Sequence, residues 1–184
     1  MSFDPSLYLS QAEAYTQGPI QFHIVGLTDV SHSKLSQLDR WKEYEDPNKV
    51  SVDRVNNRGT RNQIIREVNM DGDNENQPPA FTGQARFKLT LRDQQNNYCF
   101  AYEYNDKLSF LRQGTTTTPL PIPLGSRILV NKGTLILNGV LMLNRAQCSY
   151  LGVLEEDNQL SAQLNNGIVK KYITYLTEDL KNSK

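Results

Sequence analysis

The sequence predicts an all-β domain, a small five-stranded antiparallel barrel with a long insertion between its first two strands and a C-terminal helix. Five short apolar segments predict it, because the first three alternate with polar residues at the period of a half-buried strand. Short turns join the second segment to the third and the fourth to the fifth, whereas a long polar stretch follows the first. This combination is typical of the oligonucleotide/oligosaccharide-binding (OB) fold.

The first three strands show the clearest alternation. Ile20, Phe22 and Ile24 alternate with polar residues in the first. The second and third flank an Asp- and Asn-rich turn at 93–97, which favours an antiparallel hairpin. The Asn138-Gly139 pair is a hairpin signal between the last two strands. The five strands are expected at 20–28, 86–92, 98–104, 127–137 and 140–152.

These strands suggest three regions along the chain. We expect an N-terminal arm at 1–18, an OB-fold domain at 19–154, and a C-terminal helical segment at 155–184. The insertion between the first two strands spans 31–85. Its start has an amphipathic spacing of Leu35, Leu38 and Trp41, which predicts a short helix. The C-terminal segment has its own apolar helical face and is expected to pack on the sheet.

Composition excludes several classes of function. Lys and Arg total 20 and balance 20 Asp and Glu, so the whole molecule has no net charge to attract nucleic acid or an anionic membrane. The longest apolar stretch, 120–144, is interrupted by Arg127 and Lys132, and no secretory signal is present, so we expect a soluble intracellular protein. Cys99 and Cys148 form no metal-binding pair and are expected to be buried thiols.

Chemical motifs are scarce. The chain has only two histidines, no paired nucleophile and no phosphate-binding glycine loop, so the sequence predicts neither an enzyme nor a cofactor or metal site.

The third strand carries a row of aromatic residues, Tyr98, Phe100, Tyr102 and Tyr104, on one face. In OB folds such a row can stack nucleic-acid bases, with Lys88 and Arg92 of the neighbouring strand contacting phosphates. The row can instead belong to the barrel core, with Cys99 and Ala101 facing outward. We favour the core, because the apolar residues of the second strand need the same interior.

A basic block lies in the insertion, with Lys49, Arg54, Arg58 and Arg61 among its cations. It is equally compatible with phosphate contacts and with a solvated loop, since acidic residues follow at once and cancel its charge.

Several spaced motifs resemble one known family. They are Leu124-Gly125 with Ile128-Leu129-Val130, Gly139 to Leu143, Tyr150-Leu151-Gly152, Leu89-Thr90-Leu91 with Asp93, and Ala101-x-Glu103-Tyr104. In this order they resemble the OB core of the RecQ-mediated genome instability protein 1 family. Asp46-Pro47 and Val52-Asp53-Arg54 are similar to its fungal branch. Val153 departs from the family, which often has a second glycine there. We expect the helical region that precedes the OB fold in animal members to be missing or reduced to residues 1–18, and their second OB domain to be absent.

The resemblance implies a non-catalytic subunit of the nucleus. Members of the family bind a type IA topoisomerase III, which works with a RecQ-family helicase to dissolve double Holliday junctions in homologous recombination, DNA repair and genome maintenance. The insertion of the family reaches the DNA gate of the topoisomerase. By position in the insertion, the residues expected to contact the enzyme are Val68, Met70, Pro78, Pro79 and Phe81.

A second function is kept open. The domain can be an OB-fold protein that binds single-stranded nucleic acid directly, as its main activity or as a weak contact beside protein binding. No membrane partner is expected. The residues predicted to touch nucleic acid are Lys49, Arg54, Arg58, Arg61, Lys88, Tyr98 and Tyr102.

Overall fold

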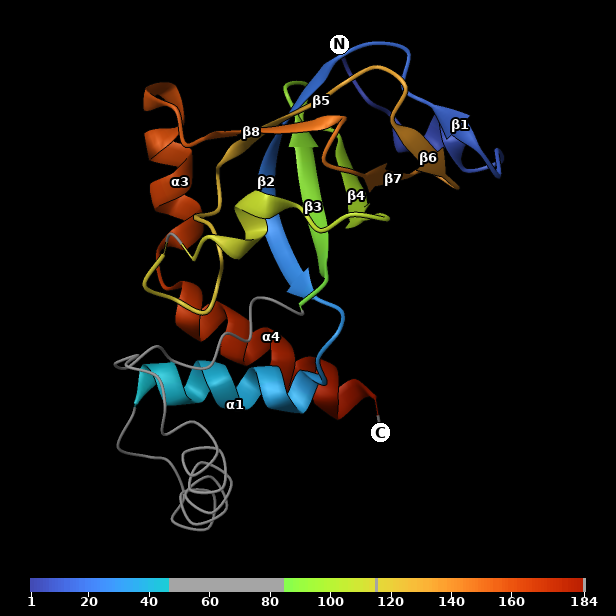
Figure 1. Ribbon diagram of the computed structural model, residues 1–184. Coiled ribbons are helices and arrows are strands. Elements are labelled where there is room, and N and C mark those ends of the chain that lie inside the picture. Colours follow the sequence, from blue (N-terminus) through green and yellow to red (C-terminus); the bar gives the residue numbers. More distant parts are fainter. Residues whose placement is uncertain (47–84, 115, 184) are drawn as a thin grey trace, which may run out of the picture.

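The strands form one curled sheet, a half-barrel, in the computed structural model, which describes residues 1–46, 85–114 and 116–183 (Figure 1). Neighbours in the sheet follow the order β1-β6-β7-β4-β3-β2-β5-β8. The strands are β1 (Ala14–Tyr15), β2 (Ile20–Asp29), β3 (Phe87–Asp93), β4 (Tyr98–Glu103), β5 (Arg127–Val130), β6 (Leu135–Leu137), β7 (Val140–Leu143) and β8 (Cys148–Gly152).

The antiparallel strands β2, β3 and β4 form the centre of the sheet and match the first three predicted strands. Ile24 pairs with Leu91, which pairs in turn with Cys99, and all three side chains point into the core. The next inward row is Leu27, Leu89 and Ala101, of which none is more than 2% exposed. A β-bulge between Ile24 and Gly26 keeps both rows on the inner face.

The favoured placement of the aromatic row was wrong. Tyr98 and Phe100 are 56% and 46% exposed, while Cys99 and Ala101 are buried. The register explains this, because Leu91 lies opposite Cys99 and Leu89 lies opposite Ala101. Residues directly opposite each other share a face, so the large leucines of β3 require small partners inside and leave the aromatic side chains of β4 outside.

The predicted count of five strands is not reproduced, because each of the last two predicted strands is divided and the predicted N-terminal arm contributes β1. A turn around Gly133, which has a φ of 84°, separates β5 from β6. A second turn, closed by a hydrogen bond from the Gln147 amide to the side chain of Asn144, separates β7 from β8. The predicted hairpin turn is present, with Asn138 and Gly139 both at positive φ between β6 and β7.

Two long helices lie side by side at one end of the sheet (Figure 1). Helix α1 (Lys34–Glu45) begins at the N-cap Ser33, and its Leu38 and Trp41 are buried while Leu35 is 54% exposed. The predicted C-terminal helical segment contains α3 (Asn158–Asn165) and α4 (Ile168–Asn182), which meet at Gly167. The short 3-10 helices are η1 (Pro5–Tyr8), η4 (Ser109–Arg112) and η5 (Glu155–Asp157).

The N-terminal residues are fixed to the sheet. Phe3 is 2% exposed and stacks on Tyr8. Its amide donates to Asp93, whose carboxylate also accepts from the amides of Gln95 and Asn97. Burial alone would raise the pKa of Asp93, but these hydrogen bonds outweigh it and hold the pKa below its ordinary value.

Both cysteines are free and buried, as their apolar segments indicated, although the favoured placement of the aromatic row had put Cys99 on the outside. Burial raises the pKa of the Cys99 and Cys148 thiols to about 12, because the thiolate would lose its hydration.

Candidate functional site

The outer face of β3 and β4 presents cationic and aromatic side chains together. Lys88 pairs with Tyr102 and Arg92 pairs with Tyr98, so these side chains lie on the same side of the sheet. The Lys88 ammonium lies 3.8 Å from the centre of the Phe100 ring, a cation–π contact. Lys88, Tyr98 and Tyr102, predicted from the sequence as nucleic-acid contacts, are therefore on one surface, although Tyr102 is only half exposed.

This surface continues into a groove. The groove has a volume of about 420 Å³ and lies between the outer face of β2–β4 and helix α4. Phe100, Thr90 and Lys88 line it from the sheet, and Ile168, Lys171 and Tyr175 line it from the helix. We refer to it below as the α4 groove.

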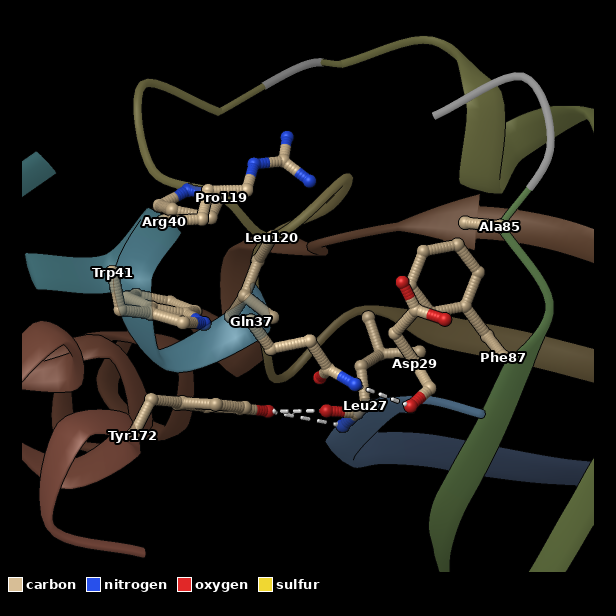
Figure 2. Close-up of a pocket in the computed structure, with 10 residues that line it drawn as sticks. All are labelled: Leu27, Asp29, Gln37, Arg40, Trp41, Ala85, Phe87, Pro119, Leu120 and Tyr172. Carbon is tan, nitrogen blue, oxygen red and sulfur yellow. Dashed lines mark hydrogen bonds between the residues drawn. The ribbon is translucent and has the colours of Figure 1, made fainter. Parts of the chain in front are cut away.

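A second cluster joins both long helices to the end of the sheet at which β2 ends and β3 begins (Figure 2). Trp41 of α1 stacks on Tyr172 of α4 with ring centres 4.6 Å apart. The Tyr172 hydroxyl donates to the Leu27 carbonyl at 2.6 Å and accepts from the Leu27 amide at 3.2 Å. Burial raises the pKa of Tyr172 to about 12. The cavity beside them holds only about 40 Å³.

The chain returns from residues 47–84 beside a buried ion pair. Glu103 is 8% exposed and accepts from the amides of Phe87 and Leu108. Arg112 lies 2.9 Å from the Glu103 carboxylate and donates to the Ala85 carbonyl at 2.6 Å. The pair therefore fixes the start of β3 and Ala85, two residues before it, since each partner of the pair also binds backbone there.

A third polar cluster attaches η5 to the sheet. Asp157, which is 4% exposed, lies 2.8 Å from the His23 ring and 2.6 Å from the Arg127 guanidinium. Glu156 forms a further ion pair with Arg127. Burial would raise the pKa of Asp157, but the hydrogen bonds from Arg127 and His23 outweigh it and hold the pKa below its ordinary value.

Comparison with known proteins matches most of the chain. Residues 5–163 match the family model described as "RMI1, N-terminal OB-fold domain". The chain belongs to this family. The RecQ-mediated genome instability protein 1 of Saccharomyces cerevisiae is 25% identical to it over 200 residues, an alignment that covers 97% of this chain and 75% of the yeast protein. The predicted family and the OB-fold assignment are thus confirmed.

Most site residues predicted for this RMI1-family domain lie outside the described residues. These are the proposed enzyme contacts Val68, Met70, Pro78, Pro79 and Phe81 and the basic residues Lys49, Arg54, Arg58 and Arg61. The structure places only Lys88, Tyr98 and Tyr102 of the predicted set.

Several polar residues of the RMI1-family domain were missed at the sequence level. Glu103 and Arg112 are separated by a connection without a strand, and His23 and Asp157 are 134 positions apart. One signal was present, because Glu103 continues the Cys99 and Ala101 side of its strand. A charged residue on the side that holds the small core residues indicates a buried ion pair.

Among the described residues, no group of three or more His, Cys, Asp or Glu side chains is arranged to hold a metal ion. Within the same ranges, no helix combines the length and the apolar composition needed to cross a bilayer.

Proposed function

We propose that this domain is a non-catalytic nuclear subunit that binds a type IA topoisomerase III and modulates its DNA gate. In this role it supports dissolution of double Holliday junctions together with a RecQ-family helicase. The family match carries the proposal, because residues 5–163 include every strand of the curled sheet. The yeast relative is named for RecQ-mediated genome instability.

The position of the β2–β3 connection supports a role for it in partner binding. Residues 47–84 leave after α1 and return at Ala85. On one side Trp41 and Tyr172 join α1 to α4, and on the other Arg112 holds the Ala85 carbonyl. Both flanks of the connection are therefore held by the rest of the domain, and binding residues are often carried by loops that a rigid scaffold positions.

Such a segment changes the gate only if it binds the open and closed states with different affinity. A difference of about 1.4 kcal/mol in binding free energy shifts the gate equilibrium tenfold. The predicted contacts Val68, Met70, Pro78, Pro79 and Phe81 would supply this difference within the inserted segment.

The test is size-exclusion chromatography of the full chain with its cognate topoisomerase III, beside a variant that lacks residues 55–84. We expect a stable complex with both proteins and an altered strand-passage rate with the full chain alone. Separate elution of the full chain and the topoisomerase refutes the subunit role. If the deletion variant alters strand passage as strongly as the full chain, the gate role of the insertion is wrong while the subunit role stands.

A second function, direct binding of single-stranded nucleic acid, is favoured by the exposed aromatic rings of Tyr98 and Phe100 beside Arg92 and Lys88. Stacking on such a ring is worth about 1–3 kcal/mol per base. The affinity for a labelled oligothymidylate, measured by titration, should then fall steeply as the salt concentration rises. Tyr98→Ala should lower this affinity about tenfold. Tyr44→Ala on α1, which removes a ring of similar exposure, is the matched control. Equal affinity of both variants excludes this function.

A further inference from the structure

The helix side of the α4 groove is an apolar face that this chain does not fully cover. Ile168, Tyr172 and Tyr175 follow the spacing of one helical face and all line the groove. Ile168 and Leu176 are buried, with exposed fractions of 7% and 2%, whereas Tyr175 is 50% exposed. The apolar face of α4 is therefore wider than the surface that the rest of the described chain covers.

The sheet side of the groove is opened by a glycine. Gly26 lies at the bulge of β2 and pairs with Thr90, which pairs with Phe100. A Cβ atom at Gly26 would lie 3.2 Å from the Thr90 hydroxyl oxygen. The missing side chain leaves space beside Thr90, and Phe100 stands at the rim with 46% of its surface exposed.

The charge on the groove has one sign. Lys88 and Lys171 line it, and no carboxylate does. The Lys88 ammonium rests on the Phe100 ring, and that of Lys171 lies 3.3 Å from the Gln163 carbonyl oxygen. Within the described part of the chain, neither lysine forms an ion pair with a carboxylate. Both ammonium groups are therefore available to an acidic ligand.

We propose that the α4 groove docks an acidic segment of a partner protein. The segment inserts an aliphatic or aromatic side chain between Phe100 and Tyr175, and its carboxylates pair with Lys88 and Lys171. The proposal does not depend on the inserted residues 47–84 or on topoisomerase binding, because every residue that carries it lies on the sheet, on α3 or α4, or just before β5.

The lining favours a peptide over a nucleic acid. Leu124, Leu164 and Ile168 contribute aliphatic surface, which suits an apolar side chain more than the polar edge of a base. The Lys88 ammonium already covers one face of the Phe100 ring, where a stacked base would have to displace it. With two cations and a neutral molecule overall, the groove lacks the continuous positive track that single strands follow.

The test is selection of random 12-residue peptides, displayed on phage, against the full chain. The enriched peptides are then measured by fluorescence polarisation against the wild type, the double variant Lys88→Glu/Lys171→Glu, and the groove-filling variant Thr90→Trp. We expect a consensus of one large apolar residue flanked by Asp or Glu. Each variant should weaken binding of the consensus peptide at least tenfold, by charge reversal in one case and by steric exclusion in the other.

Two controls separate this site from the rest of the outer face. Lys132→Glu reverses a charge outside the groove, and Tyr98→Ala removes an exposed ring that does not line it. Both should bind the consensus peptide like the wild type. The proposal is overturned if no acidic consensus emerges, or if the peptides bind the double variant as well as the wild type. It is also overturned if oligothymidylate is the only probe whose binding Lys88→Glu/Lys171→Glu abolishes.

Discussion

Gly125 shows how one residue positions a whole helix. It has a φ of 91°, and its amide donates to the Ile24 carbonyl. The preceding carbonyl, that of Leu124, accepts from both Ser161 and Asn165 of α3. The helix therefore approaches so closely that a Cβ at Gly125 would lie 2.8 Å from the Ser161 Cα.

We expect Gly125→Ala to lower the free energy of unfolding by about 2 kcal/mol or more, because strain at positive φ and a backbone clash add together. Gly152→Ala is the matched control, since Gly152 has a φ of 74° but nothing within 4 Å of an added Cβ. It should cost about 1 kcal/mol from backbone strain alone. Urea denaturation of both variants checks this, and equal costs would mean that the clash with Ser161 is absent.

Asp157 gives the chain an acid-sensitive contact. Its native pKa lies below the ordinary value of 3.8, so the unfolded state binds the proton more readily. The stability that the carboxylate contributes is complete above that value and is lost as the pH falls through the native pKa.

We expect Asp157→Asn to cost about 3 kcal/mol at pH 7, because the part-buried Arg127 then keeps only the exposed Glu156 as an ion-pair partner. The stability difference from the wild type should shrink as the pH falls below about 4. Urea denaturation between pH 7 and pH 3 measures it, with the exposed Asp106→Asn as control. A difference that stays constant with pH would show that the Asp157 charge is not what stabilises the cluster.

At the scale of elements, the Tyr172 side chain joins α1, α4 and β2. Tyr172 bonds both backbone groups of Leu27 and stacks on Trp41, the sole tryptophan of the chain. Fluorescence of Trp41 therefore reports directly on this junction.

We expect Tyr172→Phe to lower the free energy of unfolding by about 1–2 kcal/mol, since the Leu27 groups lose a buried partner. Tyr175→Phe removes the same group from a half-exposed ring three residues along α4 and should change stability by less than about 0.5 kcal/mol. Unfolding followed by Trp41 fluorescence compares the two. Equal effects would contradict the role of the Leu27 contacts.

Alternation in the sequence predicted the central strands well, because one face of each is buried and the other is not. It did not indicate which face of β4 was buried, and the assumption that the aromatic residues share the interior with the apolar residues of β3 favoured the wrong one. The length of the turn between β3 and β4 decides which face of β4 is buried. A hairpin that pairs Arg92 with Tyr98 places Leu91 opposite Cys99, so the tyrosines must share a side with the cations.

Other features of the site were beyond the reach of sequence patterns. The α4 groove combines Lys88 with Tyr175, and the Asp157 cluster combines side chains from β2, β5 and η5. Such groupings depend on how helices pack on the curled sheet, and no local period encodes that packing. The helices themselves were predicted, because their apolar spacing is local.

At the scale of the whole molecule, contacts among described residues close the base of the β2–β3 connection. Asp29 pairs with Phe87, and the Val30 amide donates to the Arg86 carbonyl at 2.9 Å. The Arg86 amide in turn donates to the Ser31 hydroxyl.

We therefore expect the variant lacking residues 55–84 to unfold cooperatively at a temperature within about 5 °C of the wild type, since shortening a loop changes closure entropy only slowly. Circular dichroism and Trp41 fluorescence would follow the transition. Loss of a cooperative transition would show that the deleted residues are needed for folding, and the deletion would then no longer isolate partner binding.

The way in which the N-terminal residues are fixed also has a consequence for synthesis. The Phe3 amide donates a hydrogen bond to the carboxylate of Asp93, 90 positions later in the chain. The Thr16 hydroxyl accepts one from the Thr134 amide, 118 positions later. Contacts of such sequence separation form slowly, because a long loop must close first. On the ribosome, the segment 3–16 thus emerges long before its partners. It must remain accessible to chaperones until Asp93 and Thr134, just before β6, have been made.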